Sequence, residues 1–308
     1  SPLQRLEVGT VSRTFFAVPL WVGIERGFFA EEGLDVNLSI FGNASQVEPL
    51  VSGRMHVAIA SPEVVLQDAH RGGPLRFVAG NAGKLSHFIV ARPRFKRVED
   101  LRGATIGILN MVEGTFFQLQ EIMARHGMNY PADYKVKETG GAPPRHKALL
   151  EGAIDAGLQS IPWVYLEEEA GLSNLGDVAD YVPDWQFTTV NVSRDWAAQN
   201  RGLLVRFLRA LLKSTDWMYR NREGTTAIVH KEMQMPLRHA ERGWEYYTGR
   251  AVLARDIGIN HKGLERVIRA QIQAGLLPRD ASIDPARYIE SGYLEEARAS
   301  MQRKEGAK

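Results

Sequence analysis

Apolar and polar positions near the N-terminus follow the pattern of one βαβ unit. The spacing of apolar residues over 18–29 predicts an amphipathic helix, and Gly33 can supply its left-handed stop. Polar and apolar residues then alternate over 35–40, as in a half-buried strand. Ligands of open α/β sheets bind outside the carboxyl ends of strands. The flanking loops 12–16 and 41–45 are therefore the first segments in which we expect a binding site.

The same reading of the whole chain predicts a series of short strands, most of them separated by helical patterns. The expected strands are residues 5–9, 35–40, 56–60, 76–79, 86–91, 105–109, 134–138, 153–158 and 188–193. Strands that alternate with helices of this length are typical of mostly parallel sheets. After about Asn200 the pattern becomes helical, and Leu204, Phe207, Leu208 and Leu211 predict the buried stripe of one helix.

Two segments predict boundaries between domains. Residues 91–103 place a proline and a cluster of charges directly after a strand, and residues 187–196 lead into the helical tail. The region between them therefore reads as an insertion. We expect an α/β fold of two lobes with mixed, mostly parallel sheets joined by two crossings. Residues 1–91 and 188–308 would form lobe 1 with its helical tail, residues 92–187 would form lobe 2, and a ligand would bind between them.

Composition and charge narrow the class of protein. The 308 residues carry 38 Lys and Arg against 36 Asp and Glu, so a net charge of +2 gives no broad field for nucleic acid. The absence of cysteine excludes disulfides, thiolate nucleophiles and Cys-ligated zinc. No apolar run approaches the ~20 residues of a membrane span, and residues 1–20 lack the features of a signal peptide. A mature, already processed chain would look the same.

Four phrases occur in an order that resembles a known family. They are RGFFAEEGLDV, VEPLVSGRMHVAIASPEVV, RVEDLRGATIGIL and KALLEGAIDAGLQSIPW. This order resembles the substrate-binding proteins of ABC importers for sulfonates, nitrate, taurine and thiamine pyrimidines, over most of the chain to about Ser193. The resemblance implies a periplasmic-binding-protein fold of type II, a periplasmic location and a membrane permease as partner.

Two helix starts provide candidate polar contacts. The segment 110–115, NMVEGT, follows a strand, and its free backbone N–H groups with the Thr115 hydroxyl predict a receptor for a carboxylate, sulfonate or phosphate. Glu113 would repel an anion and would instead suit an amine or a protonated ring nitrogen. In lobe 1, Ser61 stands at an expected N-cap before Pro62 and should face the same crevice. Capping alone also explains both segments.

Aromatic side chains at the ends of elements favour a flat ligand, such as an aromatic carboxylate or sulfonate, ahead of an inorganic oxyanion. Asparagine, serine and histidine side chains nearby could orient it. The candidate ligand-binding residues are Ser12, Thr14, Phe15, Phe16, Phe41, Asn43, Ser61, Asn81, His87, Asn110, Glu113, Gly114, Thr115, Phe116, Gln159, Trp163 and Trp185.

Catalytic motifs are absent from the sequence. The eight His residues show no metal-ligand spacing, and no dinucleotide, P-loop or hydrolase motif occurs, so we expect neither a metal nor a cofactor. The leading interpretation is a monomeric solute-binding protein that delivers a small organic molecule to an ABC permease. One alternative is an enzyme on the same scaffold, similar to thiamine-pyrimidine synthases, whose cysteine-rich motif is missing here, or to menaquinone-pathway lyases. Another is a sensor domain with the same cleft.

Overall fold

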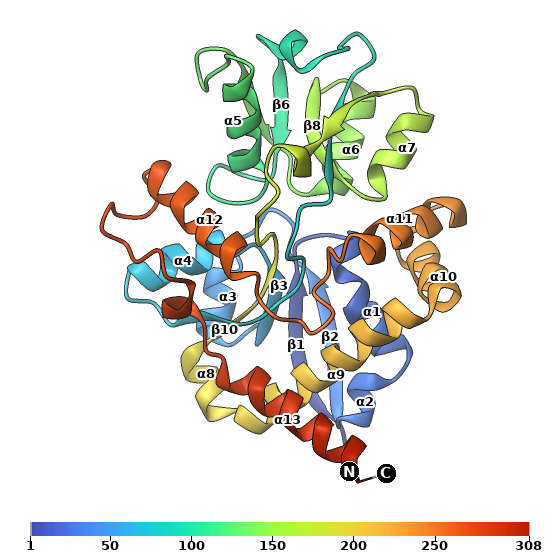
Figure 1. The fold of residues 1–308 in the computed structure, drawn as a ribbon, viewed down its shortest axis with the longest axis vertical. Helices are drawn as coiled ribbons and strands as arrows, with labels where there is room; N and C mark the ends of the chain where they lie inside the picture. The colour runs from blue at the N-terminus through green and yellow to red at the C-terminus, as the bar shows by residue number, and fades with distance from the viewer. Residues whose placement is uncertain (1, 308) are drawn as a thin grey trace.

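Two five-stranded sheets organise the chain, one in each lobe (Figure 1). The computed structural model describes residues 2–307. The sheet of lobe 1 has the order β2-β1-β3-β10-β4, built from β1 (Gln4–Thr10), β2 (Leu34–Ile40), β3 (Val57–Ala60), β4 (Leu75–Gly80) and β10 (Thr189–Ser193). The sheet of lobe 2 has the order β7-β6-β8-β5-β9, built from β5 (His87–Ala91), β6 (Thr105–Ile108), β7 (Lys135–Glu138), β8 (Ala156–Ser160) and β9 (Ser173–Asp177).

One strand in each sheet runs against the other four. In lobe 1 this strand is β10, which pairs antiparallel with β3 and β4, while β1 pairs parallel with β2 and β3. In lobe 2 it is β5, which pairs antiparallel with β8 and β9. Each of the two is the first strand after the chain passes from one lobe to the other. The expected α/β fold, with two mixed and mostly parallel sheets joined by two crossings, is confirmed.

The two crossing segments lie side by side between the lobes (Figure 1). The amide of Phe187 donates to the Ala82 carbonyl at 2.9 Å, and the Thr188 hydroxyl donates to Oδ1 of Asn81 at 2.7 Å. Because β5 belongs to the sheet of lobe 2, the first crossing lies before His87. It therefore comes earlier in the chain than the boundary expected at residue 91. The proline and charges after Ala91 mark the end of β5 instead.

Strand β9 has no counterpart among the expected strands. Its sequence, SNLGD, contains a single large apolar residue, and it lies at the edge of its sheet with half-buried side chains. An edge strand of this kind needs no apolar alternation, because its pairing with β5 supplies its backbone hydrogen bonds.

The helix expected over 18–29 is divided in two, because Gly27 adopts a φ of 78° between α1 (Val18–Glu25) and α2 (Phe28–Glu31).

Helices cover both sheets. The remaining helices of the first βα units are α3 (Val47–Ser52) and α4 (Glu63–His70), and those of lobe 2 are α5 (Phe116–Arg125), α6 (Ala142–Glu151) and α7 (Trp163–Glu169). The tail contains α8 (Arg194–Gln199), α9 (Arg201–Arg220), α10 (Arg222–Met233), α11 (Leu237–Gly249), α12 (His261–Gln273) and α13 (Gly292–Gly306). Short 3₁₀ helices are η1 (Phe15–Ala17), η2 (Val98–Leu101), η3 (Val178–Asp180) and η4 (Pro285–Tyr288). Among residues 2–307, none of the helices combines the length and the apolar character needed to cross a bilayer.

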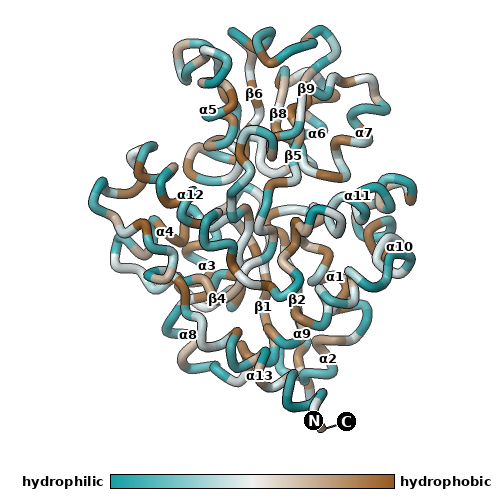
Figure 2. Tube along the Cα trace, in the orientation of Figure 1, coloured by the Kyte–Doolittle hydropathy of each residue, from teal (hydrophilic) through white to brown (hydrophobic). Residues whose placement is uncertain are grey.

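Apolar packing holds the tail against lobe 1. The expected stripe of α9, from Leu204 to Leu211, is buried, and α9 packs between α1 and α13. Figure 2 shows hydrophobic stretches along the interior elements and hydrophilic stretches on the peripheral loops. Burial of these side chains contributes roughly 25 cal/mol per Å² of apolar surface removed from water.

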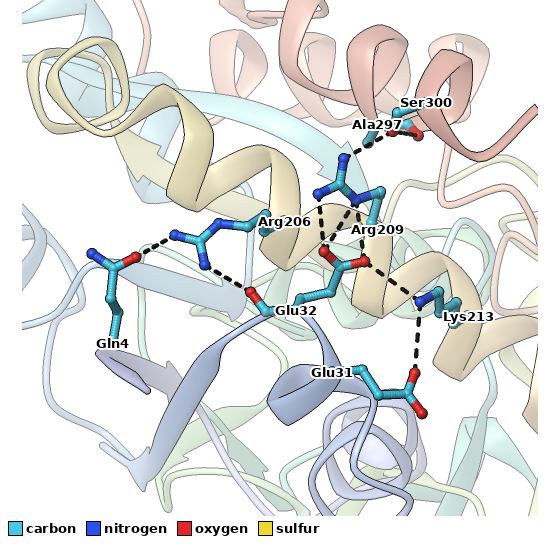
Figure 3. Close-up of polar contacts among 8 residues, drawn as sticks. All are labelled: Gln4, Glu31, Glu32, Arg206, Arg209, Lys213, Ala297 and Ser300. Carbon is cyan, nitrogen blue, oxygen red and sulfur yellow. Dashed lines mark hydrogen bonds and ion pairs between the residues drawn. The ribbon is translucent and has the colours of Figure 1, made fainter. Parts of the chain in front are cut away.

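A polar cluster at the end of α2 adds to this contact (Figure 3). Arg209 binds both carboxylate oxygens of Glu32, and Arg206 donates to the Glu32 carbonyl at 2.7 Å. Burial opposes the ionisation of Glu32, but the hydrogen bonds and charges of Arg209 and Lys213 outweigh it and lower its pKa. The tail is therefore anchored to the first βαβ unit by both apolar packing and a half-buried ion pair.

Candidate binding site between the lobes

A small chamber lies between the lobes, where strands of both sheets end. We call it the inner chamber; it has a volume of about 30 Å³, room for about one or two water molecules. Its lining comes from the segments after β1, β3, β6 and β7, from one end each of β5 and β8, and from the second crossing. The lining residues are Val11, Ser12, Thr14, Phe16, Ser61, His87, Leu109, Gly114, Thr115, Gly141, Ala142, Arg145, Ser160, Phe187 and Thr188.

Four side chains of the inner chamber have buried polar atoms that find no hydrogen-bond partner in the part of the chain that the structure describes, residues 2–307. These atoms are Thr14 Oγ1, His87 Nδ1, Thr115 Oγ1 and Ser160 Oγ. Buried polar atoms in folded proteins are nearly always paired, because an unpaired one costs about 1–3 kcal/mol. Four such atoms in one chamber, drawn from both lobes, therefore mark positions for the polar atoms of a ligand.

The hydroxyls of Ser61 and Thr115 do not cap their helices. Helix α4 begins at Glu63 after Pro62, and α5 begins at Phe116 after Thr115, with no side-chain cap hydrogen bond in either case. Capping therefore does not account for these two residues. Both line the inner chamber, and they reach it from opposite lobes.

Arg145 supplies the positive charge of the inner chamber. It lies on α6 and is 3% exposed, with Nε donating to Gln159 Oε1 and Nη1 donating to the Gly140 carbonyl, both at 2.9 Å. Burial lowers its pKa to about 10, so the guanidinium stays charged at neutral pH. Within residues 2–307 it forms no ion pair with a carboxylate. Its charge is therefore held by neutral oxygens and remains available to an anion.

The nearest compensating acid acts on Arg145 through Gln159. The Gln159 amide donates to Glu167 Oε2 at 2.7 Å, and His146 Nδ1 lies 2.6 Å from the same oxygen. Burial raises the pKa of Glu167, while the hydrogen bonds from His146 and Gln159 act in the opposite direction. Gln159 thus lies behind Arg145 and fixes the orientation of its guanidinium.

His87 is neutral in this environment. Burial lowers its pKa to about 3, and the positive charge of Arg145 acts in the same direction. The ring packs edge-on against Phe187 with centroids 4.6 Å apart. A neutral imidazole can donate from one nitrogen and accept at the other. His87 can therefore contact either type of polar atom without adding charge.

A larger cavity of about 740 Å³, which we call the vestibule, adjoins the inner chamber and shares Val11, Ser12 and Gly141 with it. Its walls come from lobe 1, lobe 2 and the end of α10. The other lining residues are Arg13, Ile40, Gly42, Asn43, Thr139, Gly140, Pro143, Pro144, Trp163, Lys231, Glu232, Met233 and Gln234. This volume lies within the range of about 300–1,000 Å³ that is usual for ligand pockets.

Direct contacts hold the two lobes together around these cavities. Trp163 Nε1 of lobe 2 donates to the Arg13 carbonyl at 3.2 Å, and Gln67 of lobe 1 donates to the Val112 carbonyl at 3.1 Å. At the outer edge, Arg238 of α11 pairs with Glu169 of α7 at 2.8 Å. The lobes are therefore closed on each other.

Two buried acids lie close to the inner chamber without lining it. Burial raises the pKa of Glu63 well above its usual value, and the charge of Glu113 raises it further. Burial also raises the pKa of Glu113, which accepts a 2.9 Å hydrogen bond from Asn110. The carboxyl of Glu113, expected to repel an anion, is therefore held within its own loop.

The structure brings about half of the predicted site residues to these cavities. Those that line the inner chamber are Ser12, Thr14, Phe16, Ser61, His87, Gly114 and Thr115. Those that line the vestibule are Ser12, Asn43 and Trp163. Those that line neither are Phe15, Phe41, Asn81, Asn110, Glu113, Phe116, Gln159 and Trp185.

Several of the expected aromatic residues belong to the core instead. Phe15 stacks on Tyr247 with centroids 4.4 Å apart, Phe116 packs edge-on against Tyr130, and Trp185 is 1% exposed. Phe41 packs against both apolar cores. Large aromatic side chains at the ends of elements can close off a core as readily as line a cleft. Their position in the sequence does not distinguish the two.

Arg145, Ser160, Gly141 and Thr188 line the inner chamber but were not among the predicted site residues. A signal for Arg145 exists in the sequence. Helix α6 buries Ala142, Arg145 and Leu149, so a basic residue occupies a position in the apolar stripe of an amphipathic helix. Since arginine is almost never fully buried unless it is paired, this placement indicates a specific role.

The family of the chain follows from a match over most of its length. A family model described as NMT1/THI5 like matches residues 15–224. The chain belongs to the NMT1/THI5-like family. The resemblance seen in the four sequence phrases is thereby confirmed.

Curated relatives include both binding proteins and enzymes. YtlA of Bacillus subtilis, named provisionally as a binding protein, is 23% identical over 290 residues, covering 90% of this chain and 85% of that protein. The 4-amino-5-hydroxymethyl-2-methylpyrimidine phosphate synthase THI13 of Saccharomyces cerevisiae is 25% identical over 222 residues, covering 67% of this chain and 64% of that protein.

Solved structures show the same fold. The periplasmic nitrate-binding protein NrtA of Synechocystis PCC 6803 has a TM-score of 0.82 at 14% identity, covering 97% of this chain and 89% of that one. The alkanesulfonate-binding protein SsuA of Xanthomonas axonopodis pv. citri, bound to MOPS, has a TM-score of 0.75 at 16% identity, covering 95% of this chain and 100% of that one. At these identities the likeness concerns the periplasmic-binding-protein fold.

Proposed function

We propose that this protein is a periplasmic solute-binding protein that captures a small organic anion between its lobes and delivers it to the permease of an ABC importer. The observation that carries the proposal is the buried Arg145, which lines a chamber shared by both lobes and pairs directly with no carboxylate of residues 2–307. The hydroxyls of Thr14, Thr115 and Ser160 and the ring of His87 surround the same chamber.

The charges around the chamber favour an anion over a cation. Arg145 lines the chamber, whereas the nearby acids Glu63 and Glu113 do not. Burial raises the pKa of both acids, which favours their neutral forms and weakens their repulsion of an anion. A carboxylate or sulfonate would accept hydrogen bonds from the guanidinium and the hydroxyls, a charge-assisted geometry that is stronger than a neutral one.

A ligand held by both lobes would stabilise the closed form, because it contacts the full set of groups only there. Closure around a bound solute is the step by which such a protein would present its ligand to a membrane permease. The names of the neighbouring structures, a nitrate-binding protein and an alkanesulfonate-binding protein, support this role and a periplasmic location. We propose that the protein acts as a monomer, since the proposed site is complete within one chain.

An enzyme on the same scaffold is the second candidate, favoured by the yeast synthase relative. The chain contains no cysteine and so lacks the cysteine-rich motif of the pyrimidine synthases. A binding protein would release its ligand chemically unchanged, whereas a synthase would alter it. Mass spectrometry of the molecule released after incubation separates these two candidates.

Native mass spectrometry of the purified protein tests the proposal first, because a ligand retained during purification adds its own mass. A thermal-shift panel of aromatic carboxylates, alkyl sulfonates, pyrimidines, nitrate and sulfate then identifies the class. A true ligand at about 100 times its Kd should stabilise the protein by roughly 2.7 kcal/mol. Stabilisation by pyrimidines alone would contradict an anionic ligand, and stabilisation by nitrate or sulfate alone would contradict an organic one.

A further inference from the structure

We propose that the ligand is an organic acid with an extended apolar tail, and that the ion pair between Arg13 and Glu232 sets the maximum length of that tail. This inference rests on the proposed function, since it assigns the acidic group of the ligand to the inner chamber. It adds the part of the ligand that lies outside that chamber and the residues that limit it.

The inner chamber accommodates only the acidic group. Its volume of about 30 Å³ is far below that of a ring or an alkyl chain, and contacts such as that of Trp163 with the Arg13 carbonyl hold the closed arrangement. Any apolar part of the ligand must therefore lie outside it, and the vestibule is the cavity next to it, with Val11, Ser12 and Gly141 lining both.

The vestibule has walls that suit such a tail. Ile40 from the end of β2, Met233 from the end of α10, and Pro143, Pro144 and Trp163 from lobe 2 provide apolar surface on several sides. Ile40 is 44% exposed, so its side chain has surface still open to water that a tail could cover. Burying each methylene there would strengthen binding, because apolar surface leaves water.

A second hollow lies beyond the vestibule and continues along lobe 1. We call it the outer groove; it has a volume of about 490 Å³, and apolar wall residues Trp21, Ile24 and Leu38. It shares Arg13, Ile40, Lys231 and Glu232 with the vestibule, so these residues stand between the two spaces.

The ion pair spans this boundary. Arg13 Nη1 donates to the Glu232 carbonyl at 3.0 Å and lies 3.4 Å from Glu232 Oε2, which joins the loop after β1 to the end of α10. The backbone of Arg13 is held at the same time by Trp163 of lobe 2. A tail that reached this point would have to displace two charged side chains, so longer tails should gain no further affinity.

The ion pair contributes little to folding and can be removed. The Arg13 side chain is 51% exposed, and exposed pairs of this kind are worth about 0–1 kcal/mol. Arg13→Ala should therefore fold and connect the vestibule to the outer groove. Arg5→Ala is the matched control, because Arg5 is 58% exposed and pairs with Glu7 outside both cavities.

Calorimetric titration with straight-chain alkane-1-sulfonates and carboxylates from one to ten carbons, each below its micelle concentration, tests the inference. For the unaltered protein, affinity should rise roughly fourfold per methylene and then stop rising at one length. In Arg13→Ala that limit should move to longer chains, and in Arg5→Ala it should stay. Ile40→Asp should weaken the longer ligands at least tenfold more than the shortest one.

Affinity that does not depend on chain length in the unaltered protein would overturn the inference while leaving an anion site in place. An unchanged limit in Arg13→Ala would overturn the role of the ion pair. Absence of binding by every sulfonate and carboxylate at every length would contradict the proposed function itself.

Discussion

The guanidinium of Arg145 and the side-chain amide of Gln159 form a single oriented pair, with Nε donating to Oε1 at 2.9 Å. Gln159 belongs to β8 and Arg145 to α6, so the sheet of lobe 2 holds the cation at the chamber wall. The amide nitrogen of Gln159 is bonded in turn to Glu167 at 2.7 Å. The guanidinium is thus positioned by neutral oxygens, and the carboxylate of Glu167 is connected to it only through Gln159.

Replacing this cation should abolish most of the anion affinity. We expect Arg145→Met, which keeps the length and apolar stem of the side chain, to weaken binding by about 1.5–3 kcal/mol, the value of hydrogen bonds to charged groups. Calorimetric titration with the best ligand of the thermal-shift panel gives the change. Arg220→Met on α9, which pairs with Asp216 of its own helix and lines neither cavity, is the control and should bind normally.

The Thr115 hydroxyl should contribute a smaller part. Thr115→Ala is expected to weaken binding by about 1–2 kcal/mol, because a hydrogen bond is lost in a site closed to water. Thr248→Ala on α11 removes a hydroxyl that bonds only within its own helix and serves as the control. Equal affinity for both variants and the unaltered protein would show that Thr115 does not contact the ligand.

His87 should make the fold sensitive to acid. The pKa of His87 is about 3 in the folded protein, against an ordinary value of 6.5. Between these two pH values the imidazole is protonated in the unfolded chain and neutral in the folded one, so acid favours unfolding. This contribution is complete above pH 6.5 and is lost as the pH falls, by roughly 2 kcal/mol at about pH 5. Denaturant unfolding of His87→Gln should show a shallower loss over that range. Identical pH profiles would contradict the buried neutral imidazole.

Glu63 should act with the opposite sign. Its pKa is raised in the folded protein, mainly by burial, so its contribution is present below the ordinary value of 4.5 and is lost as the pH rises through the folded value. Glu63→Gln should therefore gain stability relative to the unaltered protein as the pH increases from about 5 to about 8. Thermal unfolding of the unaltered protein and the variant across this pH range measures the trend. Glu48→Gln, at an exposed position of α3, is the control and should show no such trend.

Ligand should compact the protein by closing the lobes. The contacts seen in the closed arrangement, including Trp163 with Arg13 and Arg238 with Glu169, form only when lobe 2 meets lobe 1 and its tail. Small-angle scattering should give a smaller radius of gyration with ligand than without it. Removing the α11 contact with Arg238→Ala should enlarge the ligand-free form, whereas an unchanged radius in all samples would contradict hinge closure.

The sequence by itself determined the two-lobed α/β fold. Alternating strands and helices, the turn at Gly33 and the buried stripe of α9 are local patterns, and local patterns decide which segments become strands or helices. The helix starts near Ser61 and Thr115 also follow from such patterns, since Ser61 stands directly after β3 and Thr115 directly before α5. Both positions lie at the chamber because the carboxyl ends of parallel strands meet at one edge of a sheet, where ligands bind.

Only the tertiary structure decided which side chains enter the chamber. Phe15 and Trp185 occupy the same kind of position in the sequence as Phe16 and Trp163, yet the first two are packed in the core and the others line the cavities. Arg145 lies far along the chain from Thr14 and Ser61, and the meeting of these three depends on how the lobes close. The burial of a side chain and the charges around it depend on neighbours from distant segments of the chain. The spacing of residues along the sequence does not show which segments become those neighbours.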